Sequence, residues 1–120
     1  MPVNREHIFH VTTPEAWAAA ERSGTYAGDT LKTEGFIHCS CLHQLSGVAF
    51  RYYKGKQNLL LLEIDSTRLK APLKFEGKVE DFPHIYGELN VSAVHAAYPF
   101  SVKENGDMEL PRELLGSGHV

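Results

Sequence analysis

A histidine stands two positions before a hydroxyl side chain at three places in this chain: His10 and Thr12, His38 and Ser40, His84 and Tyr86. Each pair lies in a segment that reads as an extended strand, where side chains at i and i+2 point to the same face. An imidazole exchanges a proton near neutral pH, and a neighbouring hydroxyl binds polar groups. If these faces converge, they form a polar pocket that binds or processes a small ligand. The residue types alone do not specify the ligand.

The overall composition is that of a folded globular domain. The chain has 120 residues, of which 42% are hydrophobic and 22% charged, as in ordinary soluble domains. We expect a single domain over residues 1–115 and a flexible tail over residues 116–120. The net charge of −3 gives nucleic acid no overall electrostatic attraction, so nucleic acid is not the expected partner.

Cysteine usage and hydropathy favour a cytoplasmic protein. Cys39 and Cys41 are separated by one residue, too close for an easy disulfide, so both thiols are expected to be reduced. Residues 1–6 lack the apolar segment of a signal peptide, and the longest apolar run, Leu59–Leu62, is far shorter than a membrane span. No membrane partner is therefore expected.

The first half of the chain predicts two strands and two helices. Residues 7–11 are rich in aromatic and β-branched types and predict a strand. Thr13 is a helix N-cap before a first-turn proline, so a helix is expected over residues 14–22, closed by Gly24. Residues 35–40 predict a short strand. Apolar residues at helical spacing then predict a helix over residues 41–54, with Ser40 as N-cap and Gly55 as terminator.

The second half predicts mainly strands. The apolar run over residues 58–64 is typical of a central strand buried on both faces, followed by a turn at residues 65–67. Strands are expected over residues 73–76 and 94–102, with an irregular stretch over residues 77–87 between them. Asn105-Gly106 predicts a type I′ hairpin turn into a strand over residues 108–110. Strands outnumber the two early helices, which favours an α+β domain with a mostly antiparallel sheet.

A set of ordered motifs resembles a known family. The motifs are IFHVT (8–12), TEGFIHCS (33–40), RYYKG (51–55), LLEID (61–65) and FPHIYG (82–87). They resemble the small bacterial proteins called domain of unknown function 952, over roughly residues 7–101. The resemblance implies a fold like that of ADP-ribosyltransferases, in which a split sheet holds NAD in a cleft.

The resemblance also implies roles for individual residues. His10 falls where a first-strand histidine or arginine of ADP-ribosyltransferases contacts the NAD ribose. The segment IHCS (37–40) resembles the second motif of RNA 2′-phosphotransferases, although those enzymes hold phosphates with several arginines. This chain has few arginines, of which Arg51 is the best placed by motif, so RNA phosphate transfer is not expected. Glu88 is loosely placed where many such transferases carry a late glutamate.

If NAD is the substrate, the candidate residues divide by chemistry. His38 or His84 would transfer protons near neutral pH, and Glu34 or Glu88 would stabilise the positive charge that develops on the ribose. The remaining candidates are ligand-binding residues: His10, Thr12, Glu34, Ser40, Arg51 and Tyr86. No cofactor is assigned, because NAD would be a substrate.

Structural readings compete with each of these roles. A half-buried imidazole often bonds a backbone carbonyl and fixes a loop, and Thr12 and Ser40 precede helix starts that they could simply cap. Tyr86 could pack in the core. Arg51, with the lysines after it, could be a solvated helix end that complements the helix dipole.

Metal binding and thiol chemistry are the weaker alternatives. His38 and Cys39 point to opposite faces of one strand, so they do not easily share a zinc ion. Cys39 shares a face with Ile37, where a buried thiol stays protonated and is a poor nucleophile.

Three classes of function remain open. The first is a protein that binds NAD or a related nucleotide in a histidine-rich cleft and transfers ADP-ribose or cleaves its glycosidic bond. The second is a non-catalytic ligand-binding or regulatory module of the same fold. The third is a structural partner protein with an exposed apolar patch.

Overall fold

The computed structural model describes residues 6–109 and residue 114. Its longer elements are β1 (His7–Thr12), α1 (Pro14–Ser23), α3 (Leu45–Tyr52), β4 (Leu59–Asp65), β5 (Leu73–Glu76), β6 (Phe82–Ile85) and β8 (Val94–Val102). The short ones are β2 (Thr25–Tyr26), α2 (Thr30–Glu34), β3 (Ile37–His38), β7 (Leu89–Asn90) and β9 (Met108–Glu109). Three 3₁₀ turns complete the list: η1 (Leu42–Gln44), η2 (Ser66–Arg68) and η3 (Val91–Ala93).

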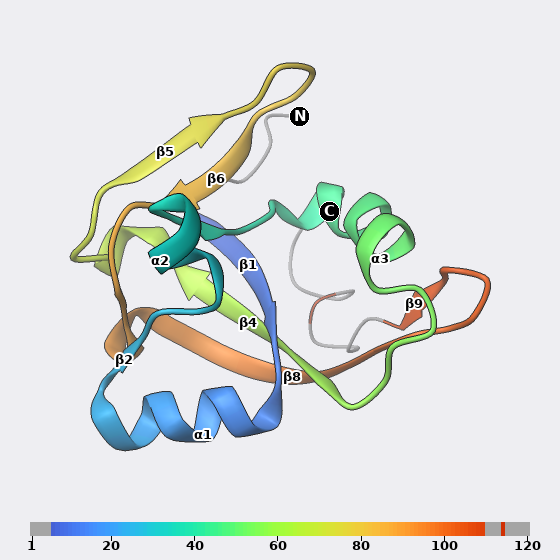
Figure 1. Ribbon diagram of the computed structural model, residues 1–120, viewed down its shortest axis with the longest axis horizontal. Coiled ribbons are helices and arrows are strands. Elements are labelled where there is room, and N and C mark those ends of the chain that lie inside the picture. The colour runs from blue at the N-terminus through green and yellow to red at the C-terminus, as the bar shows by residue number, and fades with distance from the viewer. Residues whose placement is uncertain (1–5, 110–113, 115–120) are drawn as a thin grey trace.

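The strands form separate antiparallel sheets. A four-stranded sheet has the order β1-β4-β8-β9, a three-stranded sheet the order β3-β6-β5, and β2 pairs with β7. Figure 1 shows the β5–β6 hairpin and α2 on one side of β1, and α3 on the other side. The expected α+β class with mostly antiparallel strands is confirmed.

Strand β4 carries the hydrophobic core on both of its faces. Leu62 and Ile64 pack in one cluster of buried residues with Ile8, and Leu61 packs in a second cluster with Phe9. Leu61, Leu62 and Ile64 are fully shielded from solvent. The sequence prediction of a central strand, buried on both faces, is therefore confirmed.

A backbone bridge joins the four-stranded sheet to the three-stranded sheet. Phe9 of β1 donates its N–H to the Ser40 carbonyl (2.7 Å) and accepts from the Ser40 N–H (2.8 Å). The Cys39 N–H continues the connection to the Pro83 carbonyl of β6 (3.0 Å). The segment after β3 thus hydrogen-bonds to both sheets and fixes their relative position.

Helix α1 has the predicted caps. The Thr13 hydroxyl accepts from the Ala16 N–H at 3.1 Å, and Pro14 opens the first turn. Gly24 ends the helix in the left-handed region (φ 91°), where a side chain would be strained, and donates its N–H to the Ala20 carbonyl. The predicted strands 73–76 and 94–102 also match β5 and β8.

The prediction of one helix over residues 41–54 is wrong in its details. The segment begins as the 3₁₀ turn η1, and α3 starts only at Leu45 and ends at Tyr52. The N-cap is Cys41 rather than Ser40, because the Gln44 side chain accepts from the Cys41 N–H (2.9 Å). Gln44 also donates to the Asp81 carbonyl (2.7 Å), so a long-range contact sets this start.

Two further predictions need correction. The stretch over residues 77–87 was expected to be irregular, yet it contains β6, which pairs with both β3 and β5. The Asn105-Gly106 turn is not type I′, since that type requires a positive φ at both central residues. Within residues 6–109 and 114, only Asn58 among non-glycine residues has positive φ. Gly106, at φ 94°, instead closes the turn by donating to the Lys103 carbonyl.

The remaining differences concern short elements and the terminus. β2, α2 and β7 were not predicted, because two-residue strands and a five-residue helix leave little periodicity in a sequence. Leu110 and the predicted flexible tail lie outside the described residues.

Replacing Leu62 by alanine tests the role of β4. We expect Leu62→Ala to lower the free energy of unfolding by about 3 kcal/mol, because it leaves a cavity in a fully buried site. Val79→Ala is the control: Val79 is wholly exposed, so the change should stay within about 0.5 kcal/mol. Urea denaturation followed by circular dichroism measures both, and equal effects would contradict the assignment.

Candidate functional site

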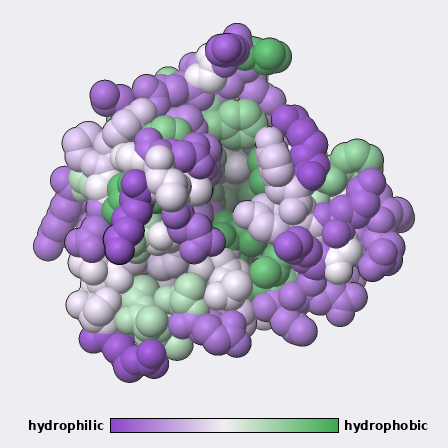
Figure 2. All heavy atoms as spheres, in the orientation of Figure 1, coloured by the Kyte–Doolittle hydropathy of each residue, from purple (hydrophilic) through white to green (hydrophobic). Residues whose placement is uncertain are grey.

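A cleft of about 1200 Å³ runs along the free edge of β1. Figure 2 shows the surface hollowed near its centre, with hydrophobic atoms inside the hollow and mostly polar atoms around it. α3 contributes one wall, and the α1–α2 region and β3 contribute the other. Most of the sequence-predicted site residues line the cleft: His10, Thr12, Glu34, His38, Ser40, Arg51 and His84.

The remaining predicted residues lie elsewhere. Tyr86 is not part of the cleft lining. Its hydroxyl donates a hydrogen bond to Glu76, and Glu76 lines the cleft. Glu88 is exposed and outside the lining. The carboxylates that face the cleft are those of Asp29, Glu34 and Glu76.

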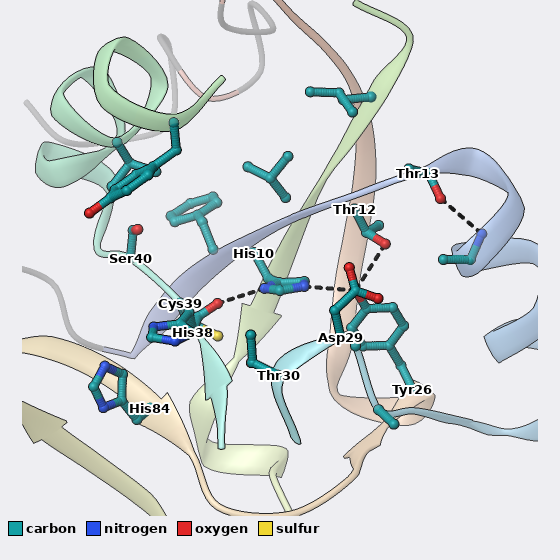
Figure 3. A pocket seen from close by; sticks show the side chains of 18 of the residues that line it. His10, Thr12, Thr13, Tyr26, Asp29, Thr30, His38, Cys39, Ser40 and His84 are labelled. Atoms are coloured by element: carbon teal, nitrogen blue, oxygen red, sulfur yellow. Dashed lines mark hydrogen bonds between the residues drawn. The ribbon is translucent and has the colours of Figure 1, made fainter. Parts of the chain in front are cut away.

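His10 is the centre of a hydrogen-bonded chain on one wall (Figure 3). Its Nδ1 lies 2.6 Å from the His38 carbonyl oxygen, and its Nε2 lies 2.8 Å from the Tyr26 hydroxyl. The same hydroxyl bonds Thr12 Oγ1 at 2.9 Å. Because a carbonyl oxygen only accepts, Nδ1 of His10 must carry a proton.

Burial makes this imidazole neutral. The pKa of His10 lies below 6.5, chiefly because burial penalises the charged form. At pH 7 the proton therefore stays on Nδ1, and Nε2 is an acceptor held against the Tyr26 hydroxyl. A ligand hydroxyl would have to compete with Tyr26 for Nε2, so His10 orders this wall of the cleft.

Two histidine–carboxylate pairs meet at the β3–β6 end of the cleft. Glu34 Oε1 lies 3.1 Å from His38 Nε2, and Glu76 Oε1 lies 3.0 Å from His84 Nδ1. The register places His38 opposite His84, with ring centroids 5.2 Å apart. This end of the cleft therefore combines two imidazoles, each oriented by a carboxylate.

Packing and hydrogen bonds fix the His84 pair most firmly. Phe36 stacks on His84, with ring centroids 4.1 Å apart and an interplanar angle of 16°. The Tyr86 hydroxyl donates to Glu76 (2.5 Å), and this bond, followed by the bond to His84, holds the pKa of Glu76 below its usual value. The ionised Glu76 keeps a proton on His84 Nδ1, which leaves Nε2 able to accept one. A carboxylate-oriented imidazole of this kind suits general acid–base chemistry.

The opposite wall carries cations and phenols. Arg51 and Lys56 line the cleft near the end of α3, together with Tyr52 and Tyr53. Tyr52 is 65% exposed, whereas burial, followed by the charge of Asp29, raises the pKa of Tyr53. The cleft thus has positive charge on the α3 wall and a carboxylate opposite it.

The two cysteines are shielded from solvent. Cys39 and Cys41 are buried and do not form a disulfide with each other. Burial raises the pKa of the Cys39 thiol far above its usual value, as the sequence indicated. Among residues 6–109 and 114, no group of three or more His, Cys, Asp or Glu side chains could hold a metal ion. No helix in the same residues is long and apolar enough to cross a membrane.

Sequence reasoning missed four residues of the site. Tyr26, Asp29, Tyr53 and Glu76 all line the cleft. The loop that follows α1 is rich in Gly, Thr and Asp, which was the only signal for Asp29. Tyr26 and Glu76 act through partners far along the chain, Thr12 and Tyr86, and no local pattern reports such pairs.

The state of His10 can be measured directly. We expect ¹⁵N-detected NMR at pH 7 to show a neutral ring with the proton on Nδ1, and a titration to give a pKa below 6.5. Since the folded pKa is the lower one, this residue's contribution to stability is complete above pH 6.5 and is lost as the pH falls through the folded pKa. A proton on Nε2, or a pKa above 6.5, would contradict the hydrogen-bond assignment.

The Glu76 pair yields an ordering of two variants. Removing the Tyr86 hydroxyl in Tyr86→Phe should raise the pKa of Glu76 more than His84→Gln does, because the Tyr86 bond is the larger cause of its depression. Carboxyl ¹³C NMR titrations of Glu76 in the wild type and both variants measure this. The reverse order would show that His84 dominates the pair.

Comparison with known proteins identifies relatives for the whole fold. A family model described as "Protein of unknown function (DUF952)" matches residues 11–97. The crystal structure of protein CC0527 from Caulobacter crescentus is similar, with a TM-score of 0.80 and 29% identity over 91% of this chain and 98% of that chain. The solution NMR structure of the same protein has a TM-score of 0.72 and 30% identity, over 84% of this chain and 90% of that chain. No curated protein matches this chain. The chain therefore belongs to the DUF952 family.

Proposed function

We propose that this protein binds NAD or a related nucleotide in the cleft along β1 and cleaves its glycosidic bond, by hydrolysis or by transfer of ADP-ribose. An ADP-ribosyltransferase-like fold, with a divided sheet around the nucleotide, is part of this proposal. A cytoplasmic location fits Cys39 and Cys41, which are buried and not joined by a disulfide.

The observation that carries the proposal is the backbone of Val11, which has no partner on its outer edge within residues 6–109 and 114. Phe9 directs its N–H and C=O away from β4, toward Ser40. Along a strand of an antiparallel sheet, the backbone N–H and C=O groups of successive residues point alternately toward one neighbouring strand and away from it. Val11 lies two residues after Phe9, so it also directs its N–H and C=O away from β4. β1 is the end strand of its sheet, and Val11 lines the cleft. The Val11 N–H can donate to the oxygen of a primary carboxamide, such as that of nicotinamide, and the Val11 C=O can accept from its NH₂ group.

The rest of the cleft matches the other parts of a dinucleotide. Arg51 and Lys56 supply positive charge for phosphates, and the exposed ring of Tyr52 offers a surface on which a base can stack. The polar wall of His10, Tyr26 and Thr12 faces this region. A volume of about 1200 Å³ exceeds the roughly 300–1,000 Å³ of most small-molecule sites, so the cleft has room for a dinucleotide.

The histidine–carboxylate pairs supply the chemistry. A water or acceptor hydroxyl attacks C1′ of the nicotinamide ribose, the C1′–N bond breaks, and nicotinamide leaves with the bonding electrons. His84 Nε2 accepts the proton of the nucleophile, while Glu76 stabilises the imidazolium that forms. Glu34, paired with His38, lies at the same end of the cleft. Its negative charge stabilises the positive charge that develops on the ribose.

A non-catalytic binding module is the second candidate. It is favoured by the position of Glu88, the late glutamate of the sequence prediction, which is exposed and outside the cleft lining. It is also favoured by His10, whose ring nitrogens both have partners within the protein. Such a module would bind the nucleotide without releasing nicotinamide.

Calorimetric titration with NAD and its nicotinic acid counterpart tests the role of Val11. The carboxylate of the counterpart has no N–H donor for the Val11 carbonyl, so we expect it to bind at least about tenfold more weakly than NAD. Equal affinities would contradict the backbone contact. If neither compound nor ADP-ribose binds, the nucleotide proposal is wrong.

Variants separate the enzyme from the module. We expect the His10→Ala/His38→Ala double variant to lose saturable binding of NAD, whereas His43→Ala, which removes an exposed histidine outside the cleft lining, keeps it. A chromatographic assay of nicotinamide release then compares wild type with His84→Ala. A release rate at least about 100-fold lower in His84→Ala supports the enzyme, and binding without release in the wild type supports the module.

A further inference from the structure

Asp29 is an N-cap residue whose side chain does not cap its helix. Aspartate at this position ordinarily accepts a hydrogen bond from a backbone N–H in the first turn. Asp29 precedes α2 with helical backbone angles (φ −85°, ψ −27°) and makes no side-chain cap bond. Within residues 6–109 and 114, its carboxylate has no hydrogen bond or ion pair, and it lines the cleft. Asp29 therefore does not cap α2, and its exposed carboxylate is available to a ligand in the cleft.

The carboxylate lies where the two walls of the cleft face each other. Figure 3 shows Asp29 beside Tyr26, at the end of the chain that begins at His10. Its negative charge contributes to the raised pKa values of both Tyr26 and Tyr53, after the larger effect of burial. Tyr53 belongs to the α3 wall, so the charge of Asp29 acts across the cleft.

The chemistry of an ionised carboxylate limits what can lie beside it. Its two oxygens only accept hydrogen bonds, and together they can accept from two neighbouring hydroxyls. A phosphate at the same place would be repelled, whereas Arg51 and Lys56 attract it at the α3 wall. The charges therefore orient a nucleotide with its sugar hydroxyls at Asp29 and its phosphates toward α3.

We propose that Asp29 binds the 2′- and 3′-hydroxyls of a ribose of the ligand, and that it thereby selects ribonucleotides over 2′-deoxyribonucleotides. The proposal rests on the nucleotide-binding function proposed above and assigns the residue that sets its sugar specificity. Removing the 2′-hydroxyl leaves one carboxylate oxygen without its partner.

The test compares ADP and 2′-deoxy-ADP on wild type, Asp29→Asn and Glu21→Gln, by isothermal titration at constant salt. ADP carries one ribose and two phosphates, so the two probes differ only at the 2′-hydroxyl. We expect the wild type to bind ADP about tenfold more tightly than 2′-deoxy-ADP. In Asp29→Asn the ratio should fall below about threefold, mainly through weaker binding of ADP. Glu21→Gln removes the same charge from an exposed site outside the cleft lining and should keep the wild-type ratio.

Each outcome has a separate meaning. Equal affinities of ADP and 2′-deoxy-ADP in the wild type, or an unchanged ratio in Asp29→Asn, would overturn the role of Asp29 and leave nucleotide binding intact. Absence of binding by ADP, NAD and ADP-ribose to the wild type would overturn both proposals. Because Asp29 makes no cap bond, the melting temperature of Asp29→Asn should match that of the wild type. If that variant does not fold, equal affinities of the wild type for ADP and 2′-deoxy-ADP would still overturn the proposal.

Discussion

The bridge between Phe9 and Ser40 is the contact on which the arrangement of the cleft depends. Its two backbone hydrogen bonds, of 2.7 and 2.8 Å, join the edge strand β1 to the segment that leads out of β3. The His10 side chain adds a third bond between the same segments, at the His38 carbonyl. Beyond this bridge the free edge of β1 is uncovered, and the cleft occupies that space. The two sheets are thus tied together at one end and separated where a ligand can enter.

The polar groups of the cleft divide into those that hold its shape and those that remain available. His10, Tyr26 and Thr12 form a chain of hydrogen bonds in which Tyr26 and Thr12 are buried. Burying these polar groups costs little free energy because every member has a partner. Asp29 and the backbone of Val11 face the cleft without such partners among the described residues. An ordered wall beside available donors and acceptors suits binding, because the protein needs little reorganisation when a ligand arrives.

The sequence predicted well those elements whose signals are local. Helix α1 combines an N-cap, a first-turn proline and a left-handed glycine, and β4 is an uninterrupted apolar run, so both could be recognised from neighbouring residues. The start of α3 could not, because Gln44 forms its cap bond at Cys41 while also reaching Asp81. The β6 strand was missed because Pro83 and the polar residues around it hide the alternation.

The candidate site shows the same division. Spacing on single strands correctly grouped His10 with Thr12 and located His38 and His84 at the cleft. It could not show that Glu76, across the β5–β6 hairpin, is the carboxylate that orients His84. Glu88 was chosen instead because the family resemblance implies a glutamate late in the chain. Residues that contact each other only in the tertiary structure show no fixed spacing in the sequence from which the contact could be predicted.

Amide NMR mapping with ADP-ribose tests the central claim, that the cleft along β1 is a nucleotide site. In ¹H–¹⁵N correlation spectra at saturation, the largest shift changes should fall on Val11, Asp29 and Tyr53. The turn that contains Asn105 and Gly106, outside the cleft lining, should be unaffected. Changes confined to that turn, or no saturable change at millimolar ADP-ribose, would contradict the account.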